Sequence, residues 1–282
     1  MAWPGIRFPH VEAPMSALRA CTPLLLLFPL SAAAQVVERT DAKAQDEVSS
    51  RWSAGLAVVH RDSEYAGEGT RTRLYPNIAY DGDRFYLRGA AFGYRLHADD
   101  RFELRAFVAG RLDGIDADDF GVAELARRGI DRSLLEDRND SVDLGMAASW
   151  KGVAGKLELD VRGDVTGTSD GYAVALDYSY PWSLGRTRVI PSVGAVRLSD
   201  DMANYYYGTL DEEIARGVVA YRPGAVTMPR ASVTVVHPFA KRWALLGNLE
   251  YRALPDALRD SPLVEEGKDQ AASLFIGVSR GF

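Results

Sequence analysis

Between Arg51 and Phe282 the sequence contains about eleven short stretches in which every second residue is apolar. Small, polar or charged residues stand between the apolar ones, so each stretch would form a strand with one apolar and one polar face. The clearest stretches are 102–109, 141–150, 156–162, 172–180 and 242–251. None is long or uniform enough to be a transmembrane helix. The pattern predicts an all-β fold, either a soluble sandwich or a membrane barrel.

Two features favour the barrel. Aromatic residues gather at the ends of the stretches, where a girdle at the membrane interface would lie: Trp52, Tyr80, Tyr94, Trp150, Tyr180, Trp182, Trp243 and Tyr251. Short connections at 81–83, 97–100, 151–154, 181–186 and 238–241 contrast with long ones at 112–140, 199–228 and 253–271. Outer-membrane barrels have short periplasmic turns and longer extracellular loops. We therefore predict a transmembrane antiparallel β-barrel over residues 51–282, with the long segments outside the cell.

The strand count needs one correction, because single-chain bacterial barrels have even numbers of strands. We expect a further strand in 199–228 or near 61–70, which gives about twelve strands, with ten as the alternative. The polar faces carry both signs of charge: Arg73, Glu103, Arg105, Arg111, Lys156, Glu158, Asp160, Arg162, Asp177, Glu250 and Arg252. In so narrow a barrel these side chains would lie close together. A salt-bridged interior is the favoured interpretation, and a narrow charged pore is the alternative.

The N-terminus has the pattern of a secretory signal. Arg19 precedes an apolar core over 24–30, and small residues at Ala32 and Ala34 fit cleavage after Ala34. We predict a signal peptide over 1–34, with Met15 as a possible true start, and export to the outer membrane of a Gram-negative cell. Residues 35–50 are polar without period and predict a flexible periplasmic lead-in.

Composition excludes some classes of function. The single cysteine, Cys21, lies within the predicted signal, so the mature chain would contain no disulfide framework. Removing residues 1–34 takes 33 basic and 39 acidic residues to 31 and 38, a net charge of −7. This acidic balance lacks the basic footprint of a nucleic-acid-binding protein.

Candidate catalytic and metal-binding residues form no convincing site. His60, His97 and His237 lie in or beside different strands without metal-ligand spacing. Ser232 and His237 are five residues apart and would point to opposite faces of a strand, so we reject them as a local hydrolase pair. A Ser/His pair across strands stays open. The acidic loop 113–119 lacks the distal glutamate of a calcium loop, and a solvated loop is the favoured interpretation.

Two loop segments allow two interpretations each. Residues 122–136 could form a short helix over the barrel mouth or an irregular loop. Tyr205, Tyr206 and Tyr207 could form a recognition surface, because tyrosine gives contact area at low entropic cost. We favour a structural role for these tyrosines, in a strand or packed against the barrel rim.

Several short motifs follow one another in a specific order. They are Tyr65-Ala66-Gly67, Pro76 inside a strand, Leu135-Glu136-Asp137-Arg138, Tyr205-Tyr206-Tyr207-Gly208, Tyr221-Arg222-Pro223-Gly224, Asp260-Ser261-Pro262-Leu263-Val264 and the terminal Phe282. In this order, behind a signal peptide, they resemble the MipA/OmpV family, the MltA-interacting scaffold proteins of the outer membrane. The resemblance covers about residues 51–282. Arg280 departs from it, because an apolar or aromatic residue usually stands two positions before the final aromatic.

The resemblance implies scaffolding without catalysis. It implies a barrel that holds a murein lytic transglycosylase near a bifunctional penicillin-binding protein in cell-wall synthesis, in contact with outer-membrane lipid and lipopolysaccharide, and without a cofactor. A narrow small-solute channel or an adhesin is the alternative. The resemblance marks Tyr65, Gly67, Pro76, Asp137, Arg138, Tyr206, Tyr207, Gly208, Asp260, Ser261 and Pro262 as family-motif or loop residues, and Phe282 as the assembly signal. We expect deletion of 35–50 to weaken partner binding more than changes in the outer loops do.

Overall fold

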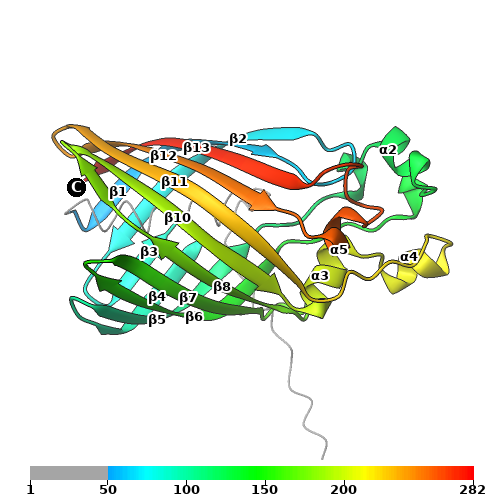
Figure 1. Ribbon diagram of the computed structural model, residues 1–282, viewed down its shortest axis with the longest axis horizontal. Coiled ribbons are helices and arrows are strands. Elements are labelled where there is room, and N and C mark those ends of the chain that lie inside the picture. Colours follow the sequence, from blue (N-terminus) through cyan, green and yellow to red (C-terminus); the bar gives the residue numbers. More distant parts are fainter. Residues whose placement is uncertain (1–49) are drawn as a thin grey trace, which may run out of the picture.

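The computed structural model describes residues 50–282 and shows an antiparallel β-barrel with helical segments packed at one end (Figure 1). The predicted signal and all but the last residue of the lead-in lie outside the described residues. The strands are β1 (Trp52–Asp62), β2 (Thr70–Asp81), β3 (Phe85–Arg88), β4 (Ala91–Ala98), β5 (Phe102–Arg111), β6 (Ser141–Gly152), β7 (Gly155–Asp164), β8 (Tyr172–Ser179), β9 (Trp182–Leu184), β10 (Thr187–Leu198), β11 (Val226–Ala240), β12 (Trp243–Ala253) and β13 (Gln270–Gly281).

Twelve of these strands form the wall. Neighbours pair in chain order, β8 pairs with β10, and pairing of β13 with β1 closes the ring. The three-residue strand β9 pairs only with β10 and extends it at one end. The prediction of about twelve strands is therefore confirmed.

The predicted position of the twelfth strand was wrong. Residues 199–225 contain two short helices and the loops that connect them, β11 begins at Val226, and 63–69 form a loop. The extra strand comes from residues 85–98, which fold back as the β3–β4 hairpin. Gly89 makes the turn with φ of +56°, a left-handed conformation that glycine adopts at little cost. The turn is only two residues long, so the alternation of apolar residues continues across it and reads as one strand.

The short β3–β4 hairpin leaves part of β2 without a strand partner. β2 pairs with β1 along its length, but with β3 only through Ala79–Asp81. Pro76 lies in the part without a β3 partner, and its missing N–H is tolerated at such an edge. The segment after β5 lies near this edge, because Asp113 and Gly114 line a small cavity together with Arg71 and other residues of β1 and β2.

Alternate side chains of each strand face outward or inward, as the sequence predicts. On β13, Leu274, Ile276 and Val278 are exposed on the outer face, whereas Phe275 is fully buried on the inner face. Bands of exposed apolar residues on the outer face suit contact with hydrocarbon. Among the described residues, no helix has the length and hydropathy to cross a membrane.

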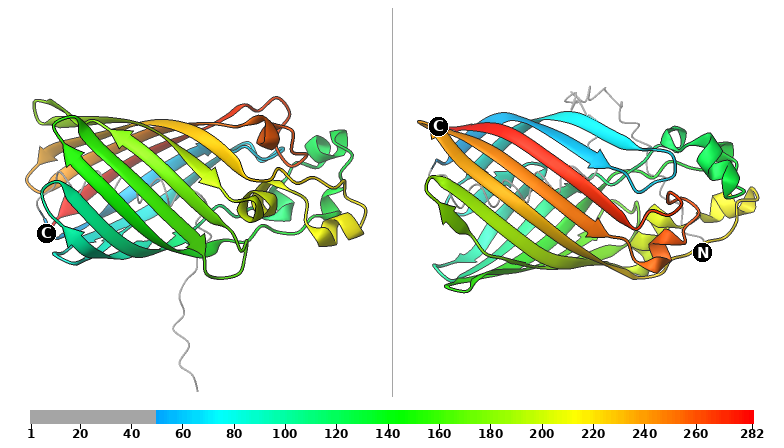
Figure 2. Two further views of the ribbon diagram at one scale, coloured as in Figure 1. Left: turned by 60° about the horizontal axis from the view of Figure 1, so that its bottom comes forward. Right: turned by 45° about the horizontal axis from the view of Figure 1, so that its top comes forward.

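The short and long connections lie at opposite ends of the barrel, which we call the turn end and the loop end (Figures 1 and 2). Helices occur only among the long connections of the described chain. They are η1 (Ala117–Asp119), α2 (Val122–Arg127), η2 (Arg132–Leu134), α3 (Asp200–Tyr207), α4 (Asp211–Ala215) and α5 (Asp256–Arg259). Ser199 begins α3 by accepting a hydrogen bond from the backbone N–H of Met202 at 3.3 Å. The segment 122–136 thus contains one short α-helix followed by a 3₁₀ turn.

Candidate functional site

The long connections pack together into one body at the loop end, which we call the loop cap. It consists of residues 63–69, 112–140, 199–225 and 254–269 (Figure 1). Its core is a cluster of buried apolar side chains that includes Tyr65, Ile115, Phe120, Leu125, Ile130, Met202, Tyr206, Tyr207, Leu258, Leu263 and Val264. A contiguous cluster of this kind makes the cap a hydrophobic core of its own, distinct from the barrel wall.

A buried ion pair ties two of the cap segments together. Arg138 donates to both carboxylate oxygens of Glu213, at 2.8 and 3.0 Å, and both side chains are almost fully buried. The same guanidinium also donates to the backbone carbonyls of Tyr205, at 2.7 Å, and Gly208, at 3.0 Å. Glu213 also accepts from the backbone N–H groups of Leu210 and Glu136. With these additional hydrogen bonds, the pair meets the condition under which buried charges are tolerated.

The tyrosine motif joins the 63–69 and 254–269 segments to α3. The hydroxyl of Tyr65 donates to the backbone carbonyl of Tyr206 at 3.2 Å, and its ring stacks on Tyr207. The hydroxyl of Ser261 donates to the backbone carbonyl of Tyr207 at 2.6 Å. A bridge between Tyr65 and Val264 completes the junction. Tyr206 and Tyr207 are buried and therefore have the structural role that the sequence favoured, although they lie on helix α3 and not in a strand.

Gly67 allows two backbones to approach closely. Its φ is +74°, and a Cβ at this position would overlap the backbone of Gly121. The N–H of Gly121 donates to the carbonyl of Ala66 at 2.9 Å, which is the bond that this approach permits. Only glycine fits both the left-handed conformation and the space.

A buried carboxylate lies beneath the tyrosines. Glu64 accepts hydrogen bonds from Arg61 and from the hydroxyl of Tyr207, at 2.8 and 2.9 Å. Burial opposes its ionisation, but the guanidinium groups of Arg61 and Arg252 lower its pKa to about 2. Burial and the nearby carboxylate of Glu64 raise the pKa of Tyr207 well above its ordinary value. Glu64 is thus charged and Tyr207 neutral at physiological pH.

The remaining motif residues lie in different places. Asp137 accepts a hydrogen bond from the N–H of Ala117 at 2.7 Å, and Pro262 is buried beside Ser261 in the cap. Asp260 is exposed at the cap surface. Pro76 faces outward on β2, and Phe282 is exposed at the turn end. The structure thus brings most of the motif together in the cap and separates Pro76 and Phe282 from it.

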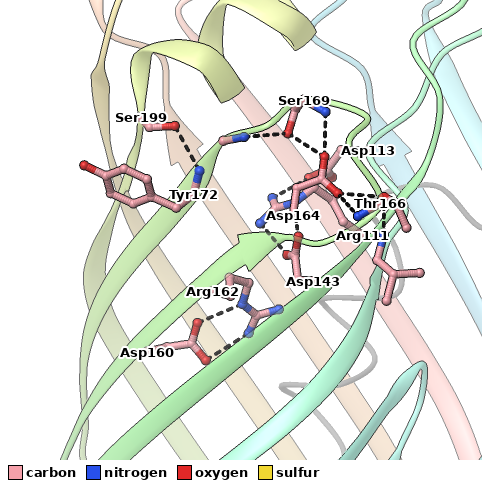
Figure 3. A network of polar contacts seen from close by, with 12 residues as sticks. Arg111, Asp113, Asp143, Asp160, Arg162, Asp164, Thr166, Ser169, Tyr172 and Ser199 are labelled. Atoms are coloured by element: carbon pink, nitrogen blue, oxygen red, sulfur yellow. Dashed lines mark hydrogen bonds and ion pairs between the residues drawn. The ribbon is translucent and has the colours of Figure 1, made fainter.

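The inner face of the barrel carries the predicted charges, and they form ion pairs. Figure 3 shows Arg111 between Asp143 and Asp113, with N–O distances of 2.6 and 3.3 Å. Further down the wall, Arg105 contacts Glu158 at 2.6 Å. The ion pairs match the salt-bridged interior that the sequence favoured over a narrow charged pore.

The candidate chemical residues are not brought together. Each of the three histidines within residues 50–282 hydrogen-bonds to a different polar residue, His60 to Thr72, His97 to Asp99 and His237 to Thr187. No group of three or more His, Cys, Asp or Glu side chains within residues 50–282 is arranged to hold a metal ion. In the acidic loop, Asp113 and Asp119 instead form ion pairs with Arg111 and Arg71.

The turn end has a different surface. Aromatic rings pair along it, the exposed Trp52 with the half-buried Tyr80 and the exposed Trp150 with the half-buried Phe102. The guanidinium of Arg280 lies over the rings of Trp243 and Phe282, 5.8 and 5.3 Å from their centroids. Such cation–π contacts place the charge of Arg280 among aromatic residues at the end of the barrel.

Comparison with known proteins decides the family. Residues 54–282 match the family described as "MltA-interacting protein MipA". The chain belongs to this family. The resemblance predicted from the ordered motifs is thereby confirmed, and the match covers all but the first two residues of the barrel.

Two relatives come from Escherichia coli K12. The "Putative outer membrane protein YiaT" is 26% identical over 239 residues, which cover 83% of this chain and 92% of the relative. The "MltA-interacting protein" is 28% identical over 216 residues, which cover 76% and 83%. Among solved structures, the porin NanC superposes with a TM-score of 0.46 at 9% identity, covering 81% of this chain and 100% of NanC. The closed ring of strands and the family match together identify the chain as an outer-membrane β-barrel, as the sequence predicted.

Sequence reasoning missed the role of Glu64. Its partners Arg61, Arg252 and Tyr207 come from β1, β12 and α3, and only the closed barrel brings them together. Its one signal in the sequence is a carboxylate directly before Tyr65 at the end of an alternating stretch.

Proposed function

We propose that this protein is a non-enzymatic scaffold of the outer membrane that holds a murein lytic transglycosylase and a bifunctional penicillin-binding protein together in cell-wall synthesis. Membership of the MltA-interacting protein family carries the proposal, because a relative that is 28% identical bears that name. The turn end would face the periplasm, where murein and both enzymes lie. Its exposed side chains are available for contact.

The packing of the loop cap also supports the proposal. Arg138 and Glu213 are buried against each other and the apolar side chains of the cap pack in one cluster, so the long connections are occupied by contacts within the chain. A narrow small-solute channel is the alternative, although charges of the inner face such as Arg105 and Arg111 are paired with carboxylates. Discrete conductance steps in a planar bilayer would support that alternative.

Binding of the folded mature barrel to a purified MltA-type lytic transglycosylase tests the proposal. We expect a saturable complex, detected by co-elution from a gel-filtration column in detergent. Folding is verified by the heat-dependent shift in electrophoretic mobility. A folded barrel that forms no complex would overturn the scaffold proposal. We further propose that residues 35–50 contribute to this contact, so that their deletion weakens it more than changes in the loop cap do.

A further inference from the structure

Cations and acids are unevenly distributed around the turn end. At the turn end, the β6–β7, β8–β10 and β11–β12 connections and the end of the chain form one set, which we call the basic arc. It consists of residues 151–156, 180–188, 238–243 and 280–282. They contain no Asp or Glu and seven cations: Lys151, Lys156, Arg186, Arg188, Lys241, Arg242 and Arg280. The connections on the other side, 81–84 and 97–101, contain four Asp and two Arg residues. Because strands pair in chain order, each set is contiguous around the barrel.

Four cations of the basic arc are exposed and have no acidic partner. Arg186, Lys241, Arg242 and Arg280 form no ion pair with any described residue. Apolar side chains stand beside them with large exposed fractions, 54% for Trp182, 63% for Leu184, 50% for Phe239 and 59% for Phe282. The β9–β10 hairpin, the β11–β12 turn and the chain end lie next to one another in both views of Figure 2. The surface thus combines free positive charge with exposed apolar and aromatic groups.

The backbone at Arg242 gives a second, independent observation. Its φ is +64°, in the left-handed region that non-glycine residues adopt only at a cost of about 1 kcal/mol or more. Glycine would fit this turn at lower cost. Unfavourable conformations of this kind cluster at functional sites. An arginine at this position therefore points to a use for its charge.

The one-sidedness of the charge distinguishes between lipid and protein partners. Phospholipid surrounds the barrel on all sides, so a role in anchoring to lipid phosphates would place cations in every turn. The acidic turns 81–84 and 97–101 do not fit that expectation. A discrete partner that contacts one side of the rim explains why the cations lie on that side alone. Arginine and tryptophan are also the residue types that contribute most to protein–protein binding energy.

We propose that the basic arc is the docking surface for an acidic face of a periplasmic protein. The inference rests on the proposed scaffold function, and the protein that it places on the arc is the lytic transglycosylase. The exposed cations would steer an acidic partner to the arc and fix its orientation, while Trp182, Leu184 and Phe239 would be covered in the complex.

Two charge-matched double variants of the full mature barrel test this inference. K241E/R242E reverses two cations of the basic arc, and R84E/R101E makes the same change in charge on the other side of the rim. We expect K241E/R242E to weaken binding of the purified transglycosylase at least tenfold, and R84E/R101E to change it less than twofold. Wild-type affinity should fall as salt increases from 0.05 to 0.5 M, because exposed charges are screened.

The possible results are distinct. If the wild-type barrel binds and both variants bind equally well, the docking surface is wrong and the scaffold function stands. If the folded wild-type barrel does not bind, both proposals fail. If K241E/R242E loses affinity for vesicles of anionic phospholipid but binds the enzyme normally, the arc is a lipid anchor. R242G gives a check free of folding defects, because we expect it to fold at least as well as the wild type and still bind severalfold more weakly; unchanged binding by R242G would count against the arc.

Discussion

The two ends of the barrel treat their charged and aromatic residues in opposite ways. In the loop cap, Arg138 and Glu213 are buried against each other, and Tyr65 and Tyr207 stack within a core. At the turn end, aromatic rings are exposed and several cations have no acidic partner among the described residues. A group whose bonding capacity is satisfied internally stabilises its own chain, whereas an unsatisfied one is available to another molecule. Long connections need not be the interacting ones.

The largest effect on the cap should come from breaking its buried ion pair. Arg138→Ala leaves Glu213 buried without its cation, and breaking such a pair costs about 3–5 kcal/mol. Amide hydrogen exchange of the cap segments measures this loss as a lower opening free energy. Arg127→Ala is the control, because its pair with Glu124 is exposed and contributes at most about 1 kcal/mol. Equal protection in the two variants would contradict the account of the cap.

The stability of the cap should depend on pH through two carboxylates whose pKa values are shifted in opposite directions, Glu64 and Asp140. The pKa of Glu64 is lowered to about 2, so its contribution of about 3 kcal/mol is present above its ordinary pKa and is lost as the pH falls through 2. Burial and repulsion by Asp113 raise the pKa of Asp140 to about 6, although it accepts a hydrogen bond from the N–H of Gly114. Its stabilising contribution is therefore present below its ordinary pKa and is lost as the pH rises through 6.

Hydrogen exchange of the cap between pH 2 and 8 checks the direction of both effects of pH on stability. We expect protection of the cap to be greatest near pH 4, around the ordinary pKa values of the two carboxylates, after correction for intrinsic exchange rates. Glu64→Gln should remove the loss on the acid side, and Asp140→Asn the loss on the alkaline side. If protection of the cap still falls at low pH in Glu64→Gln, Glu64 is not the source of that loss.

Two glycines with the same φ separate backbone strain from close packing in the cap. Gly67 and Gly267 both have φ of +74°, but a Cβ at Gly67 would overlap Gly121, whereas a Cβ at Gly267 meets no atom within 4 Å. Gly267→Ala should cost only the left-handed conformation, about 1–2 kcal/mol. Gly67→Ala should cost this and about 1–3 kcal/mol more for the displaced backbone. Amide hydrogen exchange in the cap measures the loss of stability in each variant. Equal losses in the two variants would show that the backbone of Gly121 shifts without a measurable cost in free energy.

The sequence predicted the barrel well because alternation reports directly which face of a strand is apolar. It could not place the twelfth strand, since the two-residue turn at Gly89 continues the alternation from β3 into β4. It grouped Tyr65, Arg138, Tyr207 and Gly208 by resemblance, but could not show that Tyr65 stacks on Tyr207 or that Arg138 donates to the carbonyl of Gly208. Their contacts join segments far apart in the chain, and no local periodicity records such contacts.

The smallest effect on stability should come from the turn end. Trp182 is 54% exposed on a hairpin outside the twelve-stranded wall, so Trp182→Ala should change the free energy of unfolding by less than about 1 kcal/mol. Binding of the transglycosylase should nevertheless fall severalfold. Titration with urea in detergent measures the first quantity, and equilibrium binding the second. A large loss of stability with unchanged binding would reverse the contrast between the two ends.

The most direct test is amide hydrogen exchange of the folded mature barrel with and without the lytic transglycosylase. We expect the partner to slow exchange in 181–188 and 238–243 at the turn end and to leave exchange in the loop cap unchanged. Slower exchange in 112–140 or 199–225, with none at the turn end, would contradict this expectation.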